Sequence, residues 1–250
     1  MVKRMEVEGQ VYSSNNYGDV IILEYINSYN VKIRFINTGY VTTTQMSNIR
    51  SGGVRDPYVP TVFGIGVLGD KYATCVNSKT VKEYLLWHSM LERCYSTLQH
   101  VKNPSYTGCT VSENFKSYEY FYEWCHLQHG FSIEGWQLDK DLLVKGNKIY
   151  SENTCVFIPR EINNALSNTG SSGNQYPLGV SKQGCSFIAR LNGTDGRSVY
   201  LGRFNTPEEA FLAYKYHKEQ YLEHLAYKWE PYIDTRAFYA LLNYIVEITD

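Results

Sequence analysis

Residues 136–166 read WQLDKDLLVKGNKIYSENTCVFIPREINNAL. The apolar residues before Asp139 predict a short strand that ends in two carboxylates, and a second strand is expected after residues 151–153. Gly146-Asn147 predicts a turn between them. Pro159 introduces a short helix, because proline suits the start of a helix but not its interior. We expect a hairpin that leans on this helix, which can bring a carboxylate from the first strand and a carboxamide from the helix onto one divalent cation.

Three motifs in this stretch have a distinctive spacing of polar residues and glycine. They are Leu138-Asp139-Lys140-Asp141, Gly146-Asn147-Lys148-x-Tyr150-Ser151-x-Asn153-x-Cys155 and Ile162-Asn163-Asn164. These motifs resemble the HNH (ββα-metal) endonucleases of bacteriophages, including intron-encoded homing enzymes, and the resemblance covers about 84–168. It implies a DNA endonuclease in which Asp139 and Asn163 ligate Mg²⁺ or Mn²⁺ and Asn153 braces the hairpin. Oxygen ligands of this kind suit Mg²⁺.

One position departs from the family pattern. Family members place a histidine directly after the aspartate, where it takes a proton from the attacking water, whereas this chain has Lys140. A protonated lysine cannot accept a proton. Asp141 could serve as the base, or His126 or His129 could approach from the preceding helix. The alternative is a nuclease fold that has lost cleavage and is retained for DNA binding.

Residues 176–225 predict a separate module of three short strands and one long helix. Thr206-Pro207-Glu208-Glu209 has the residues that begin a helix: a capping threonine, a proline and two acids. This segment resembles the APETALA or ethylene-response-factor DNA-binding domain, which occurs appended to phage HNH nucleases. The resemblance implies double-stranded DNA as partner. The residues expected to contact it are Lys182, Arg190, Asn192, Arg197, Tyr200 and Arg203, with Arg190 suited to guanine and Arg203 to phosphate.

The composition limits which partners and which cellular compartment we expect for this protein. The 250 residues carry a formal net charge of −1, so no global basic field indicates nucleic acid, but the segment 176–205 has a local basic excess. The six cysteines form no C-x-x-C pair, and no apolar run reaches membrane-spanning length. We expect a reduced, cytoplasmic protein, in the host cytoplasm if phage-encoded, with no membrane partner and no small-molecule cofactor. The oligomeric state stays open.

The predicted fold class is α+β with three domains. Residues 1–70 are expected to form a small antiparallel β-barrel, which is either a packing module or a docking domain for DNA or protein. Residues 71–168 are expected to form the HNH-like domain, and residues 176–250 the three-stranded sheet with its helix and a C-terminal docking helix. The polar stretch 169–175 is the predicted linker.

Two further helices are predicted in the central part. Residues 80–97 have helical spacing of apolar side chains after Thr80, with Glu83 three positions on, which is typical of a capping box. Residues 117–129 carry an aromatic stripe that favours a core role over a platform for base stacking.

Three functions fit these patterns. The first is a metal-dependent, site-directed DNA endonuclease, expected to nick because one active site cuts one strand. The second is a DNA-binding protein without cleavage, such as a repressor or an occluder of sites. The third is a virion or partner-binding protein that uses the N-terminal domain.

Overall fold

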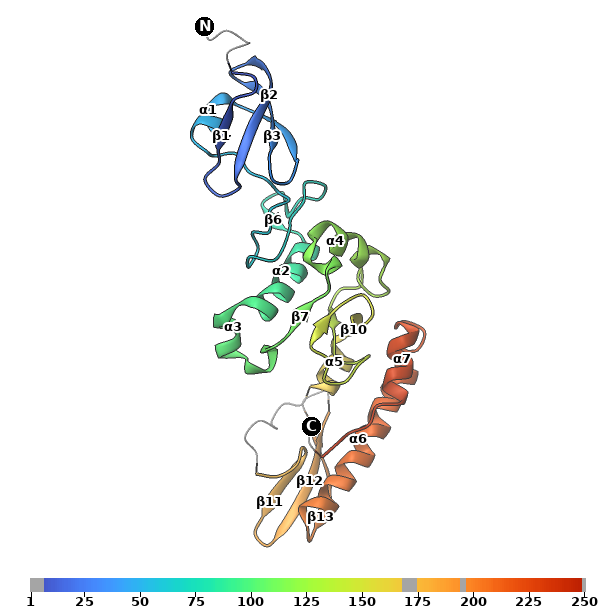
Figure 1. The fold of residues 1–250 in the computed structure, drawn as a ribbon. Coiled ribbons are helices and arrows are strands. Elements are labelled where there is room, and N and C mark those ends of the chain that lie inside the picture. The colour runs from blue at the N-terminus through green and yellow to red at the C-terminus, as the bar shows by residue number, and fades with distance from the viewer. Residues whose placement is uncertain (1–6, 168–174, 194–196, 249–250) are drawn as a thin grey trace. The chain divides into compact units, whose positions relative to one another are not determined.

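The computed structural model describes residues 7–167, 175–193 and 197–248 (Figure 1). The chain is a mixed α+β protein with several small sheets, and none of the sheets in these ranges closes into a barrel. Residues 169–174 of the predicted linker and residues 194–196 of a predicted turn lie outside the described residues. Within the described ranges, no helix combines the length and the hydrophobicity that crossing a membrane requires.

The chain divides into two compact units. The first comprises Met1–Thr107 and Glu113–Tyr122, and the second comprises Gly108–Ser112 and Glu123–Asp250. The predicted boundaries at residues 70 and 168 therefore do not coincide with the boundaries of the units. The predicted hairpin and the predicted three-stranded sheet belong to the same unit.

The first unit begins with an antiparallel sheet of four strands in sequential order. The strands are β1 (Val11–Ser13), β2 (Asp19–Asn27), β3 (Asn30–Phe35) and β4 (Val41–Thr44), followed by helix α1 (Met46–Arg50). Alternate residues of β3 are fully buried, as expected for a sheet with one core face. The barrel prediction was wrong, because the short edge strands β1 and β4 do not pair in the described structure. The sheet stays open, and α1 contributes Met46 and Ile49 to its core.

The rest of the first unit is mainly helical. It contains β5 (Cys75–Val76), β6 (Lys79–Thr80), α2 (Lys82–Tyr95), α3 (Thr97–Lys102), the 3₁₀ turns η2 (Pro104–Tyr106) and η3 (Asn114–Lys116), and the start of α4 (Tyr118–Leu127). The predicted cap at Thr80 was wrong: Thr80 ends β6, and Val81 occupies the cap position without a side-chain bond. Tyr118, Phe121 and Trp124 of α4 are buried, so the aromatic stripe is core.

The second unit contains the predicted hairpin and helix. Its elements here are β7 (Thr110–Val111), β8 (Trp136–Asp139), β9 (Ile149–Tyr150), β10 (Val156–Pro159) and α5 (Arg160–Leu166). β8 pairs antiparallel with β10, with Asp139 opposite Val156 and Gln137 opposite Ile158. All four residues of β10 are buried, and α5 begins directly after it. The short strand β9 lies in the loop of this hairpin and pairs in parallel with β7.

The three-stranded sheet of the second unit packs on a long helix. Strands β11 (Val180–Gln183), β12 (Ser186–Asn192) and β13 (Ser198–Phe204) form an antiparallel sheet along α6 (Pro207–Trp229) (Figure 1). Ala189 of the sheet and Ala210 of the helix are fully buried between them. Small side chains at these positions allow close approach. Gly179 is required for the same reason, since its φ is +75° and an added Cβ would lie 2.1 Å from Tyr214 Cδ2.

The start of α6 confirms the predicted cap. Thr206 Oγ1 accepts a hydrogen bond from the Glu209 amide, and the Glu209 carboxylate accepts one from the Thr206 amide, so two otherwise unpaired donors are satisfied. We expect Thr206→Ala to lower the free energy of unfolding by about 1 kcal/mol, and Thr206→Ser to have a smaller effect. Denaturant unfolding measures both values. Equal stability of Thr206→Ala and the wild type would contradict the role of this cap.

The C-terminal tail folds back on α6. Helix α7 (Thr235–Leu242) buries Ala237 and Leu241, which agrees with the predicted docking helix. After α7, Val246 enters the core between the sheet and α6. Lys215 of α6 donates to the Val246 carbonyl at 2.6 Å, and the Val246 amide donates to Glu219 at 2.9 Å. The tail is therefore part of the packed structure of the second unit.

Candidate functional site

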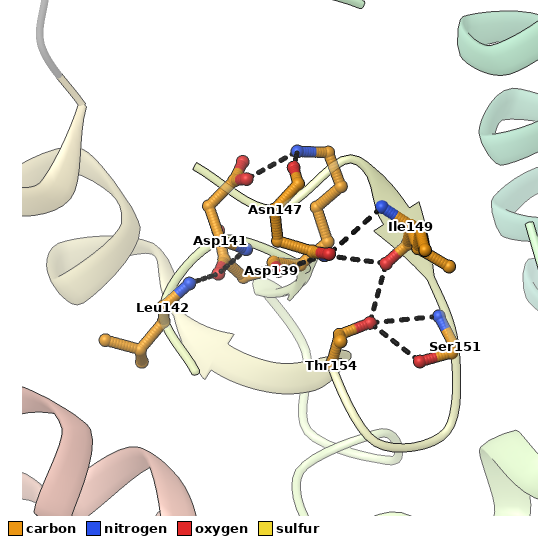
Figure 2. A network of polar contacts seen from close by, with 8 residues as sticks. Asp139, Asp141, Leu142, Asn147, Ile149, Ser151 and Thr154 are labelled. Atoms are coloured by element: carbon orange, nitrogen blue, oxygen red, sulfur yellow. Dashed lines mark hydrogen bonds and ion pairs between the residues drawn. The ribbon is translucent and has the colours of Figure 1, made fainter. Parts of the chain in front are cut away.

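Asp139 ends strand β8 and holds the first turn of the following loop. Its Oδ1 accepts hydrogen bonds from the amides of Asp141, at 2.9 Å, and Leu142, at 2.7 Å (Figure 2). This local pattern is typical of aspartate, whose short side chain bonds backbone groups two or three residues on. All contacts of Asp139 involve Oδ1, so Oδ2 has no hydrogen-bond donor among the described residues.

The Asp139 carboxyl lies in an environment that disfavours its charge. Burial raises its pKa above the usual value, and the negative charge of Asp141 adds to this, while the two loop amides and Lys140 act in the opposite direction with less effect. A divalent cation bound at Oδ2 would relieve this penalty. The surroundings of this carboxylate therefore suit a bound cation.

Asn163 reaches β8 from helix α5. Its Nδ2 donates to Gln137 Oε1 at 2.5 Å, and this bond leaves Asn163 Oδ1 without a donor among the described residues. Gln137 and Asp139 are two residues apart on β8, so their side chains leave the same face of the strand. The carboxamide of Asn163 is thereby held on the face that also carries the Asp139 carboxylate.

Lys140 is buried, and its ammonium group donates hydrogen bonds to two acceptors of the loop. Only 7% of its surface is exposed. Its Nζ donates to Asp141 Oδ1 at 2.5 Å and to the Asn147 carbonyl at 2.7 Å (Figure 2). The same Nζ lies 5.7 Å from the centre of the Tyr150 ring. An ammonium group has three donors and no acceptor. Lys140 therefore closes the loop as a donor and offers no acceptor for a proton.

The hairpin is braced by Asn147 and Thr154, and not by Asn153. Asn147 Nδ2 donates to the carbonyls of Lys140, at 2.8 Å, and Ile149, at 2.6 Å, while Thr154 Oγ1 donates to the Ile149 carbonyl at 2.6 Å. Asn153 is exposed and makes no side-chain hydrogen bond among the described residues. The signal for Asn147 was present in the sequence, since asparagine after glycine in a turn commonly bonds nearby backbone groups.

The alternative bases have different surroundings. Asp141 is exposed and is paired with Lys140. His126 and His129 are exposed on and just after α4; His126 packs edge-on against Phe131 at 5.0 Å. Neither histidine is among the contacts of Asp139. The described structure thus brings only Asp141, of these three, next to the Asp139 loop.

The donor set defines which metal could bind. No group of three or more histidine, cysteine, aspartate or glutamate side chains gathers in the described part of the chain. Cys155, which precedes β10, is buried, and burial raises its thiol pKa to about 12, so it offers no thiolate. One carboxylate and one carboxamide with open positions fit Mg²⁺, which keeps several waters and takes substrate phosphate as a ligand. Asp139 and Asn163 are the residues that would hold it.

The outer face of the three-stranded sheet carries most of the predicted DNA contacts. Arg190 of β12 lies opposite Tyr200 of β13, with the guanidinium 5.8 Å from the ring centre. Asn192 is two residues further along β12, on the same face. Arg203 donates to Gln183 at 3.0 Å, and because these residues lie on the two outer strands, the bond spans the central strand. Arg190, Asn192, Tyr200 and Arg203 are all exposed.

Two predicted contact residues lie elsewhere. Lys182 is opposite Phe187, which packs toward α6, so the register places Lys182 on the helix side of the edge strand. Lys182 was expected to contact DNA together with Arg190, but the two residues lie on opposite sides of the sheet, because the sequence did not show which strand residues alternate inward. Arg197 is exposed just before β13, where its carbonyl accepts a bond from the Gly193 amide at 2.8 Å.

Helix α6 connects the sheet with the hairpin and α5. Its N-terminal half packs on the sheet, whereas in its C-terminal half Lys228 donates to Glu161 at 2.6 Å and Trp229 donates to the same carboxylate at 2.8 Å. Trp229 also contacts Trp136 of β8, with ring centres 6.1 Å apart. Between these sites the buried Lys218 ammonium donates to the Ala165 carbonyl near the end of α5. One helix thus contacts the elements that carry the two candidate sites.

Lys218 gives the protein a measurable pH dependence. Burial lowers its pKa from the usual 10.5 to about 8, which costs on the order of 3 kcal/mol at neutral pH. Between pH 8 and 10.5 the unfolded chain binds more protons than the folded one, so this group makes the free energy of unfolding rise with pH. We expect Lys218→Met to be more stable at pH 7 by about 1–2 kcal/mol, after the loss of one hydrogen bond.

The measurement is denaturant unfolding of both proteins at several pH values. The advantage of Lys218→Met should shrink between pH 8 and 10.5, as the wild-type lysine loses its proton in the folded state. A stability difference that does not change with pH would show that burial does not lower the pKa of Lys218.

Comparison with known proteins adds no residues to this description. No protein-family model, no curated protein and no solved structure matches the chain. The interpretation of the two sites therefore depends on the geometry of the residues described above.

Proposed function

We propose that this protein is a metal-dependent DNA endonuclease of the HNH type, which binds duplex DNA through the outer face of its three-stranded sheet. One observation carries the proposal: Asp139 Oδ2 and Asn163 Oδ1 are two oxygens without a donor among the described residues, and Asn163 of α5 is hydrogen-bonded to Gln137, which shares a face of β8 with Asp139. When bound, Mg²⁺ would neutralise phosphate charge and lower the pKa of a water molecule.

The chain's own residues provide positioning and DNA binding. Asp139 Oδ1 fixes the loop after β8, and Lys140 closes that loop through Asp141 and Asn147. The exposed Arg190 and Arg203 offer guanidinium groups to bases or phosphates. Helix α6 contacts both the sheet that would bind the duplex and α5, which carries Asn163, so it connects the two proposed sites within one unit.

A specific observation favours a second candidate, a DNA-binding protein without cleavage. The position of the family's general base is filled by a buried lysine whose ammonium donates to two loop acceptors. Water activation then depends on Asp141 or on a group supplied by the substrate. Without such a base, the same scaffold would bind DNA and leave it intact.

Nicking of supercoiled plasmid distinguishes the two candidates. The purified chain is incubated with a supercoiled plasmid that carries DNA from the genome encoding the protein. Parallel reactions contain Mg²⁺, Mn²⁺ or EDTA. The endonuclease converts supercoiled to open-circular plasmid only with metal. Salt-sensitive DNA binding without nicking in either metal would support the DNA-binding protein without cleavage. If the protein shows no salt-sensitive DNA binding, both candidate functions are excluded.

A further inference from the structure

We infer that Gln137 is a positioning residue for the proposed metal site, where it sets which end of the Asn163 carboxamide faces the cation. The inference rests on the proposed function, because it concerns the same site. Gln137 is part-buried on β8, and its Oε1 accepts the Asn163 Nδ2 donor at 2.5 Å. That bond crosses from β8 to α5.

The reason lies in the chemistry of a carboxamide. Its oxygen and nitrogen ends are nearly equal in size, but only the oxygen can ligate a cation, and the NH₂ end repels one. A half-turn of the Asn163 amide would therefore replace a ligand by a donor. An acceptor at residue 137 holds the NH₂ end and leaves the oxygen available.

The hydrogen bond between Gln137 and Asn163 can form in two orientations of the two amides. Its own Nε2 has no acceptor among the described residues, and Asn163 Oδ1 has no donor. Both amides can turn together, after which Gln137 would donate to Asn163 Oδ1 and withdraw that oxygen. The two arrangements keep one hydrogen bond each, so a cation selects the first. Removing the acceptor at 137 leaves the Asn163 amide unrestrained.

The test measures Mn²⁺ affinity of the whole chain without DNA, by the loss of the free Mn²⁺ signal in electron paramagnetic resonance. We expect Gln137→Met to weaken binding about 10-fold, the usual effect of losing a group that orients a metal ligand. Gln137→Glu can only accept, so it should bind Mn²⁺ at least as tightly as the wild type. Gln220→Met, an exposed position on α6, is the matched control and should not change the affinity.

A double-variant comparison separates orientation from general damage. In Asn163→Asp both side-chain oxygens are equivalent, so no partner is needed to orient them. Adding Gln137→Met to Asn163→Asp should therefore leave Mn²⁺ affinity unchanged. An equal 10-fold loss in both backgrounds would overturn the inference, because it would indicate a structural effect of residue 137. If Gln137→Met does not fold, the Gln137→Glu result decides: a weaker affinity than that of the wild type overturns the inference.

The proposed function and this inference fail in different ways. If the wild type binds Mn²⁺ no more tightly than Asp139→Ala does, the metal site itself is absent and both fail. If Asp139→Ala loses binding while Gln137→Met binds as the wild type does, the metal site stands and the role of Gln137 is refuted.

Discussion

Asp139→Ala should lose metal-dependent nicking by at least about 100-fold, the size of effect seen when one electrostatic contact to a transition state is removed. The physical reason is that Oδ2 of this carboxylate has no other role among the described residues. Nicking of supercoiled plasmid at saturating Mg²⁺ gives the rate. Asn163→Ala should show a loss in the same direction.

Controls separate this loss from unfolding. Glu134, an exposed carboxylate in the loop before β8, provides a matched variant, and Glu134→Ala should nick at the wild-type rate. DNA binding by Asp139→Ala should persist, because the outer face of the sheet is unchanged. An Asp139→Ala protein that nicks as fast as the wild type would refute the assignment of the metal ligand. Asp141→Asn tests the remaining base, since its loss should abolish nicking only if Asp141 accepts the proton.

Arg190→Ala should weaken binding to the preferred duplex by about 5- to 150-fold, which corresponds to the 1–3 kcal/mol expected of a guanidinium that contacts a base edge. Arg190 is exposed at the centre of the outer face, where the Tyr200 ring restricts it. The duplex is first selected from a randomised pool with the wild-type chain. Fluorescence anisotropy at fixed ionic strength then gives the dissociation constants.

Lys182→Ala is the matched control for charge. It also removes one exposed positive charge from the sheet, but its register with Phe187 places it on the opposite side. Its affinity for the selected duplex should stay close to that of the wild type. If Lys182→Ala weakens binding as much as Arg190→Ala does, DNA does not contact the outer face alone, and the assignment of that face is wrong.

Local signals in the sequence were sufficient for several elements. Thr206 and Pro207 fixed the start of α6, because capping residues act on the helix that immediately follows them. The strand expected after residues 151–153 is β10, and Pro159 indicated the start of α5. Each of these signals lies within a few residues of the element that it introduces.

Predictions that depended on distant partners were less successful. Thr80 has the residues of a cap, but pairing with Cys75 draws it into β6, and Val81 precedes the helix instead. The N-terminal strands alternate as barrel strands do, yet closure requires the edge strands to meet, which alternation does not determine. The side of the sheet on which Lys182 lies depended on the register with β12.

In the candidate site, too, the sequence indicated single residues but not the contacts between residues that are distant in the chain. The sequence indicated Asp139 and Asn163, but not the bond through Gln137 that brings the helix to β8, because the two partners are 26 residues apart. It also indicated that Lys140 is unsuited to act as a base. It did not indicate that Lys140 is buried and closes the loop on the Asn147 carbonyl, since both features depend on the folded hairpin.

The central claim is that Asp139 and Asn163 share one divalent cation. Crystals of the whole chain grown with Mn²⁺, with anomalous diffraction recorded at the manganese edge, test it most directly. We expect one anomalous peak in contact with both Asp139 Oδ2 and Asn163 Oδ1. A structure with no peak between these two side chains at saturating Mn²⁺, or with the two side chains directed away from each other, would contradict it.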